Sequence, residues 1–136
     1  MYLNRLNPEQ KELFIDLCIH AAMANNVFQD EEKELVDQYC VEMQMPEPRY
    51  TANHDFDTAV SRIKEISTPQ EIKMILLEIT GIILADDVFD DDEQVFMNDF
   101  IQKINVSREC LDDMVNSLEK LKRLYAHIDA LIANLL

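Results

Sequence analysis

The chain repeats itself at one constant offset, and this repeat constrains the fold more than any other feature. Two motifs occur twice: Asn7-Pro8-Glu9-Gln10 with Thr68-Pro69-Gln70-Glu71, and Ala24-x-x-Val27-Phe28-x-Asp30-x-Glu32 with Ala85-x-x-Val88-Phe89-x-Asp91-x-Glu93. In each copy an apolar segment precedes the turn and a one-sided apolar stripe follows it, which is typical of two paired helices. Two units are too few for a solenoid. The pattern therefore predicts an all-α compact helical bundle with two pseudo-symmetric helix–turn–helix repeats, at about 7–45 and 68–106.

The predicted helices begin and end at residues that suit helix termini. Asn7 and Thr68 each precede a proline, which combines an N-cap with a residue preorganised for the first helical position. Asn25-Asn26 is expected to end the first helix, and Met45-Pro46 the second. A short amphipathic helix should follow the loop at 46–55. With a single Gly and four Pro in 136 residues, the chain should form about six to seven helices joined by turns, in one domain over 1–136.

The segment 107–136 carries an apolar residue at alternating spacings of three and four, the heptad pattern of a packed or coiled helix. Ser107 is its expected N-cap, and a bend near Asn116-Ser117 would divide it into two helices. The stripe has two interpretations. It packs on its own domain, or its distal part forms a homodimer or partner surface made by Leu121, Tyr125, Ile128, Ile132 and Leu135.

Charge and composition exclude several classes of function. The chain has 27 acidic and 12 basic residues, a net charge of −15, which repels nucleic acid and anionic lipid surfaces. A protein partner with a basic surface, or a cation, suits it better. No stretch reaches the roughly 20 apolar residues of a membrane span, and the first residues lack a signal core. Three widely spaced cysteines indicate buried thiols in a reducing compartment, so a cytoplasmic location is expected.

The turn of the second repeat is the most specific feature, because six of the eight residues from 86 to 93 are carboxylates. One interpretation is structural: Asp90 and Glu93 have the spacing of a capping box, and further acids suit the positive end of a helix. The other is a hard divalent cation, Ca²⁺, Mg²⁺ or Mn²⁺ rather than Zn²⁺, which prefers clustered carboxylates and would relieve their repulsion.

An EF-hand does not fit this turn, because a loop starting at Asp86 would need oxygen ligands at Val88 and Met97. The candidate metal ligands are therefore Asp86, Asp90 and Glu93, with Asp87, Asp91, Asp30 and Glu32 as weaker candidates.

An apolar helix that ends in Ala-Asp-Gly, followed by an apolar pair and a helix that opens with acids and a Glu, is the pattern of the TerB-like (tellurite-resistance) domain family. The chain resembles this family over roughly residues 7–120, at 85–93 and again at 24–32, with Asn26 and Asp87 in place of the family glycines. The resemblance implies a compact all-helical domain with an acidic surface, in tellurite resistance and broader stress or phage-defence systems. Metal chelation by these acids has been proposed for the family. Asn25 replaces the first aspartate, which favours the second turn.

These features together predict a non-enzymatic acidic interaction module with a divalent cation at the second turn. The alternative is a metal-free scaffold or dimerisation domain that uses its C-terminal helix, as a monomer or a homodimer. A hydrolase built on Glu32 and Glu93 ranks behind both, because the chain has no nucleophile motif or phosphate-binding loop. Gly81 in a helix interior indicates a close approach between helices.

Overall fold

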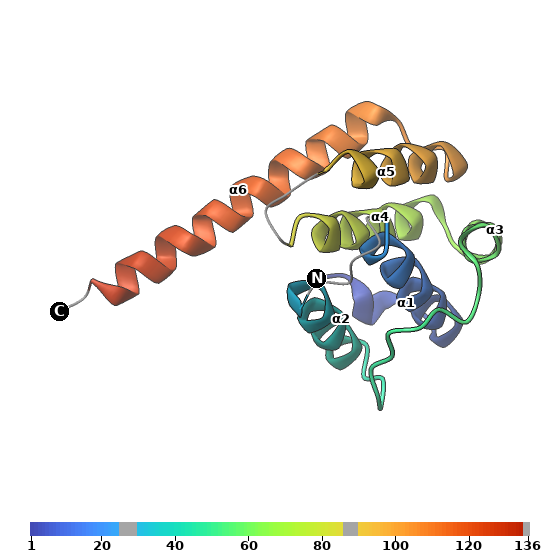
Figure 1. Ribbon diagram of the computed structural model, residues 1–136, viewed down its shortest axis with the longest axis horizontal. Helices are drawn as coiled ribbons and strands as arrows, with labels where there is room; N and C mark the ends of the chain where they lie inside the picture. Colours follow the sequence, from blue (N-terminus) through green and yellow to red (C-terminus); the bar gives the residue numbers. More distant parts are fainter. Residues whose placement is uncertain (25–29, 86–89, 135–136) are drawn as a thin grey trace.

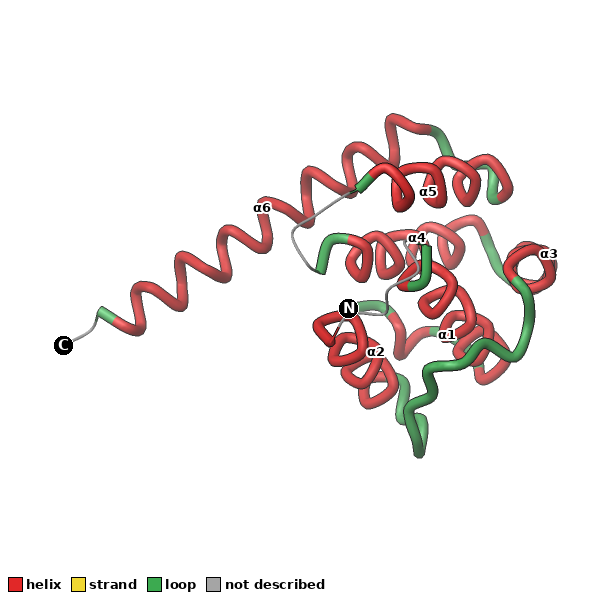
Figure 2. The backbone as a smooth tube through the Cα atoms, viewed as in Figure 1, coloured by secondary structure: helices red, strands yellow, loops and turns green. Residues whose placement is uncertain are grey.

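The structure, a computed structural model, describes residues 1–24, 30–85 and 90–134. These residues form a short 3-10 helix and six α-helices, which confirms the all-α prediction, and Figure 2 contains no strand among them. In chain order the elements are η1 (Leu3–Arg5), α1 (Pro8–Ala22), α2 (Asp30–Glu42), α3 (Phe56–Ile66), α4 (Pro69–Ile83), α5 (Asp91–Lys103) and α6 (Arg108–Ala133).

Helices α1 and α4 form the centre of the bundle (Figure 1). Helix α3 packs on α1, α2 packs on both central helices, and α6 lies across α4 and α5. Ten of the 15 residues of α1 are buried, because its apolar side chains point in nearly every direction, as the sequence predicted for a central helix. Phe14 and Leu17 of α1 and Leu76 and Ile79 of α4 are among the fully buried side chains of this core.

The four predicted N-caps are all present. The side chains of Asn7, Thr68 and Asp90 each accept a hydrogen bond from the backbone N–H three residues later, and the side chain of that later residue accepts one from the cap N–H. Ser107 caps α6 by accepting from the N–H of Cys110. Each cap satisfies N–H groups that the first helical turn leaves without a partner.

The bounds of the helices repeat at the same offset as the sequence motifs. Helices α1 and α4 have 15 residues each, and α2 and α5 have 13 each. The ends of α2 and α5 also match, because Gln44 (φ 58°) and Asn105 (φ 59°) are both left-handed. The N–H groups of Met45 and Val106 then close back on the helix end, at 2.9 and 3.0 Å from the carbonyls of Cys40 and Ile101. The superposition of the two units in space stays a prediction.

Two expected boundaries shift. The first helix ends at Ala22, before Asn25-Asn26, which lie outside the described residues. The second ends at Glu42, before Met45-Pro46, because the left-handed Gln44 reverses the chain before the proline is reached.

Helix α6 is one continuous helix of 26 residues, without a break at Asn116-Ser117. At 1.5 Å per residue it is about 39 Å long, whereas α4 beneath it is about 22 Å long. Its first half packs on the bundle through the buried Leu111 and the half-buried Met114. Its distal part projects away from the other helices (Figure 1). The expectation that the whole stripe packs on its own domain is therefore wrong for this distal part, where Leu124, Ile128 and Ile132 are exposed.

The described helices include none that is long and apolar enough to cross a membrane. Cys18 and Cys40 are buried and Cys110 is half-buried, all as free thiols. Burial raises the pKa of the Cys18 thiol well above its usual range.

Candidate functional site

The acidic turn of the second repeat is described only from Asp90 onward, so Asp86 and Asp87 lie outside the described residues. The predicted capping box is confirmed. Asp90 Oδ1 accepts from the backbone N–H of Glu93 at 2.8 Å, and Glu93 Oε1 accepts from the N–H of Asp90 at 3.2 Å. Glu93 is 1% exposed, whereas Asp91 beside it is exposed. Helix capping thus accounts for the position of two of the three main metal candidates.

In the first repeat Glu32, at the position that matches Glu93, is buried too. It is 1% exposed in the first turn of α2, next to the exposed Asp30. Among residues 1–24, 30–85 and 90–134, the structure brings together no group of three or more His, Cys, Asp or Glu side chains that could hold a metal ion. The predicted cation site therefore depends on residues 86 and 87 and stays a prediction.

A buried ionic cluster on α1 was missed by the sequence analysis. Asp16 is 1% exposed, and Arg49 donates to its Oδ1 from Nη1 at 2.8 Å. The same oxygen accepts from the backbone N–H of Asn53, and Oδ2 lies 2.8 Å from His54 Nδ1. His20 donates from Nε2 to the His54 carbonyl at 2.8 Å. An aspartate in the middle of an apolar helix was the signal for this cluster, because a buried carboxylate needs partners.

This cluster holds a loop in place. These partners of Asp16 all come from the loop between α2 and α3, and Arg49 also donates to the carbonyls of Glu12 and Thr51. The cluster therefore fastens the longest loop of the fold to α1 and seats the start of α3, where Asp55 caps the helix.

An apolar groove of about 300 Å³ lies where α6 leaves the bundle. Its floor comes from α2 and α4, and its wall comes from α6. The lining residues are Leu35, Tyr39, Gly81, Leu84, Ala85, Leu118, Leu121, Lys122 and Tyr125. Tyr39 donates a hydrogen bond to the Glu78 carbonyl at 3.0 Å, and burial raises the pKa of its phenol well above the usual range. A Cβ on Gly81 would lie 3.2 Å from the Tyr39 hydroxyl, so the predicted close approach at Gly81 is confirmed.

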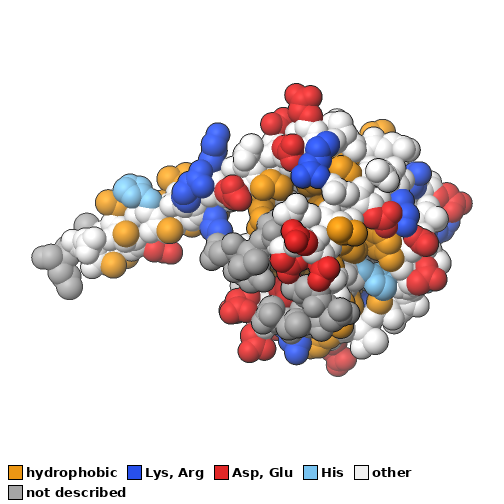
Figure 3. All heavy atoms as spheres, turned by 45° about the horizontal axis from the view of Figure 1, so that its top comes forward, with side chains coloured by type: hydrophobic (Ala, Val, Ile, Leu, Met, Phe, Trp, Pro, Cys, Tyr) orange, Lys and Arg blue, Asp and Glu red, His pale blue; other side chains and the backbone are white. Residues whose placement is uncertain are grey.

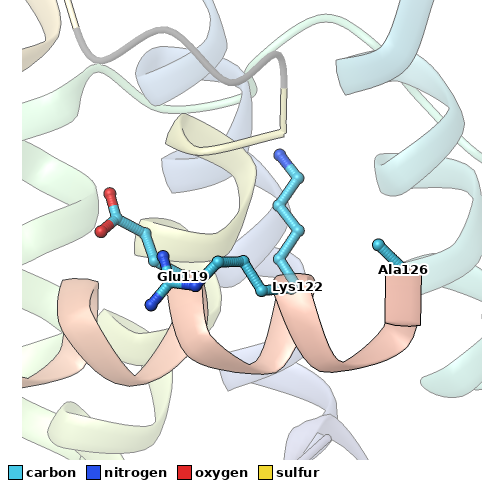
Figure 4. A pocket seen from close by; sticks show the side chains of 4 residues that line it. Glu119, Lys122 and Ala126 are labelled. Atoms are coloured by element: carbon cyan, nitrogen blue, oxygen red, sulfur yellow. The ribbon is translucent and has the colours of Figure 1, made fainter. Parts of the chain in front are cut away.

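Lys122 holds α6 at the rim of this groove. Its Nζ donates to the Leu84 carbonyl at 3.0 Å, at the C-terminal end of α4, where a cation is favoured by the helix dipole. Figure 4 shows Lys122 rising from α6, with Glu119 and Ala126 at either side of it. These residues and Arg123 line an open hollow of about 500 Å³ on the charged side of the helix.

Along its distal part, α6 carries an exposed apolar stripe. Its members are Leu124, Tyr125, Ile128, Leu131 and Ile132, each between 42% and 63% exposed. They fall within a third of the helix circumference at 100° per residue, and hydrophobic side chains are visible along the projecting helix in Figure 3. We call these five residues the arm stripe, and residues 122–133 of α6 the arm.

The arm stripe shares three residues with the predicted partner surface, whose role as an interface stays a prediction. Tyr125, Ile128 and Ile132 belong to it. Leu121 is half-buried in the groove instead, and Leu135 lies outside the described residues. Leu124 and Leu131 were missed because they flank the heptad positions. They become part of the surface because no helix of the described bundle reaches that far along α6.

Comparison of the chain with protein-family models, with curated proteins and with solved structures gives no match, so the resemblance to the TerB-like family stays a prediction.

Proposed function

We propose that this protein is a non-enzymatic helical interaction module that associates with a second copy of itself through the arm of α6. The observation that carries the proposal is the arm stripe, five large apolar side chains exposed together on a helix that extends beyond its own bundle. Together they make a contiguous patch of the kind that marks an association surface, unlike single exposed apolar residues elsewhere.

The energetics of the arm support a covered state. The part of a helix that lacks tertiary contacts is only marginally stable in water, because most helical stability in proteins comes from packing of an apolar face. Burial of one large apolar side chain contributes about 1.5–3 kcal/mol. A partner that covers the arm stripe would therefore stabilise both the helix and the complex.

The pattern of the arm supports a second copy as this partner. Apolar residues at alternating spacings of three and four interlock best with a helix of the same spacing, and the arm supplies that pattern itself. Residues 117–136 have three basic and two acidic side chains, whereas residues 1–116 have nine basic and 25 acidic ones. Pairing through the arms thus joins two segments that each have a net charge of +1, and it leaves the remainder of each chain, at −16, outside the contact.

The divalent cation at the second turn and the stress or tellurite-resistance context are separate proposals from the sequence. Self-association requires neither, because Asp90 and Glu93 have capping partners within the chain. The location in the cytoplasm and a basic protein partner likewise stay predictions.

Sedimentation equilibrium of the full chain over a range of concentrations tests the proposal. We expect a monomer–dimer equilibrium for the wild type and a monomer for Ile128→Asp, which puts a charge at the centre of the arm stripe. Ala130→Asp is the matched control, since Ala130 is exposed on the opposite side of the same helix turn, and it should leave the equilibrium unchanged.

Neither variant should alter the thermal midpoint of the bundle at low concentration, because both positions are outside the core. A wild type that stays monomeric up to about 0.5 mM, where even an association of about 4–5 kcal/mol would be detected, would contradict the proposal. Equal loss of the dimer in both variants would also contradict it, since the stripe would then have no special role.

A further inference from the structure

We infer that the two arms of the proposed dimer pair antiparallel, in one register, with Lys122 of each copy facing Asp129 of the other. The inference rests on the proposed self-association and adds its geometry. It follows from the charges beside the arm stripe, from the shape of the molecule at the base of α6, and from the charge of the bundle.

The heptad positions of the arm identify its flanks. With Tyr125 and Ile132 at a and Leu121 and Ile128 at d, the e flank carries Lys122 and Asp129 and the g flank carries Leu124 and Leu131. One flank is therefore charged, with both signs, and the other is apolar. The apolar g flank is the reason that the arm stripe is wider than a two-residue seam.

Antiparallel helices related by a twofold axis place like flanks together, whereas parallel helices place opposite flanks together. In the antiparallel pair Leu124 meets Leu131 of the second copy, and Lys122 meets Asp129 of the second copy. In the parallel pair Leu124 would instead face Asp129 of the second copy. That contact would desolvate a carboxylate against an apolar side chain without a partner, which is costly.

One register satisfies both flanks. When Tyr125 of one copy lies opposite Ile128 of the other, each dimer has two Lys122–Asp129 pairs. A shift by one heptad in one direction brings Lys122 against Lys122, and a shift in the other direction brings Asp129 against Asp129. Like charges directly opposite are destabilising, so the flank charges select the register.

The groove at the base of α6 fits this register. Leu121 lines the groove together with Leu84 and Tyr39, and the register places Ile132 of the second copy opposite Leu121. The tip of each arm thereby reaches the apolar groove of the other copy. The stripe and the groove form one continuous apolar surface, with Tyr125 common to both.

The charge of the bundle supports the same orientation. Residues 1–116 have a net charge of −16 in each copy. Parallel arms would hold the two bundles side by side, about 8–10 Å between helix axes. In the antiparallel register Lys122, which is bonded to its own bundle through Leu84, lies about 14 Å along the helix axis from Lys122 of the other copy. This exceeds the Debye length of about 8 Å at physiological ionic strength, so the bundles repel each other less than they would with parallel arms.

Charge reversal of the e flank tests the inference. Lys122→Glu and Asp129→Lys should each weaken the dimer by about tenfold, because each replaces two attractive pairs with two repulsive ones. The double variant should return the dissociation constant to within about threefold of the wild type. Arg123→Glu is the matched control, since it makes the same charge change at an exposed position on the outer face of α6.

Lys122→Glu also removes the hydrogen bond from Lys122 to the Leu84 carbonyl within one copy, so a second measurement that leaves Lys122 in place is needed. A spin label at Ala133→Cys, with Cys110→Ser and the buried Cys18 and Cys40 retained, reports the distance between the two arm tips. The antiparallel register puts the labels about 20 Å apart along the axis, whereas parallel arms would put them side by side, about 10 Å apart.

The outcomes separate the two proposals. A monomeric wild type overturns self-association and the register with it. A dimer in which the double variant is as weak as the single variants, or in which the tip labels are side by side, overturns the antiparallel register and leaves self-association intact. Restored affinity with the longer label distance supports both.

Discussion

Gly81 and Tyr39 should be energetically coupled, although they belong to different helices, α4 and α2. Gly81 lies inside α4, and a Cβ there would be 3.2 Å from the Tyr39 hydroxyl, the one heavy atom within 4 Å among the described residues apart from its chain neighbours and the backbone of its own helix. That hydroxyl is not free to move away, because it donates to the Glu78 carbonyl at 3.0 Å. The Tyr39 ring is also held, edge-on to Phe14 with centroids 5.4 Å apart.

The magnitudes follow from these contacts. Gly→Ala in a helix interior should stabilise the protein by about 1 kcal/mol. The new methyl group must push the hydroxyl by a few tenths of an ångström, which costs much of a hydrogen bond that contributes about 1 kcal/mol. Gly81→Ala alone should therefore change stability by less than about 0.5 kcal/mol, because a propensity gain of about 1 kcal/mol is offset. In a Tyr39→Phe background the obstacle is absent, and the same substitution should gain about 1 kcal/mol.

Urea unfolding of the four proteins measures this coupling. Tyr39→Phe alone should lose about 1 kcal/mol, and the double variant should be close to the wild type, which gives an interaction energy of about 1 kcal/mol. The measurement belongs at low protein concentration, so that association does not contribute. If Gly81→Ala stabilises both backgrounds equally, within about 0.3 kcal/mol, the close approach has no energetic consequence and the reasoning is refuted.

Three further predictions concern the bundle and the turn. Burial raises the pKa of Tyr39 in the folded protein, whereas an unfolded tyrosine ionises at about pH 10. The free energy of unfolding should therefore fall as the pH rises above about 10, and it should fall less steeply in Tyr39→Phe. Urea unfolding at a series of pH values from neutral to alkaline checks this. Arg49→Ala should lower the free energy of unfolding by about 2–3 kcal/mol, measured by thermal unfolding, because the buried carboxylate of Asp16 loses a partner. Arg62→Ala, which breaks an exposed ion pair, should lower it by less than about 1 kcal/mol. Equal losses in the two variants would contradict the role of the cluster. Calorimetric titration with Ca²⁺, Mg²⁺ and Mn²⁺ should show saturable binding that Asp86→Asn with Glu93→Gln removes; no heat in the wild type would exclude the cation site.

Local chemistry made the helix starts predictable from the sequence. The side chain of an Asn, Thr, Asp or Ser at an N-cap accepts a hydrogen bond from a backbone N–H two or three residues later. The caps therefore need no contact with the rest of the fold, as at Asn7, Thr68, Asp90 and Ser107. The buried character of α1 could be predicted for a related reason, because a helix that is apolar on every side has no side to expose. The capping box of Asp90 and Glu93 belongs to this group as well.

The ionic cluster around Asp16 could not be found in the same way. Its partners come from a loop beyond the far end of α2, and no periodicity links an aspartate in one helix to Arg49 and His54. The path of that loop depends on where α2 ends and on how α3 packs against α1. Such a contact depends on the three-dimensional arrangement of elements that are each well predicted.

The repeat determined by itself that this chain is helical and where most of its helices begin, and the heptad spacing after it determined that the last segment carries an apolar stripe. Only the tertiary structure decided what covers that stripe. A heptad pattern has the same form whether its partner is the same bundle or another molecule. The difference arises from length: α6 is about 17 Å longer than the α4 helix on which it lies, and its distal residues project beyond the described bundle.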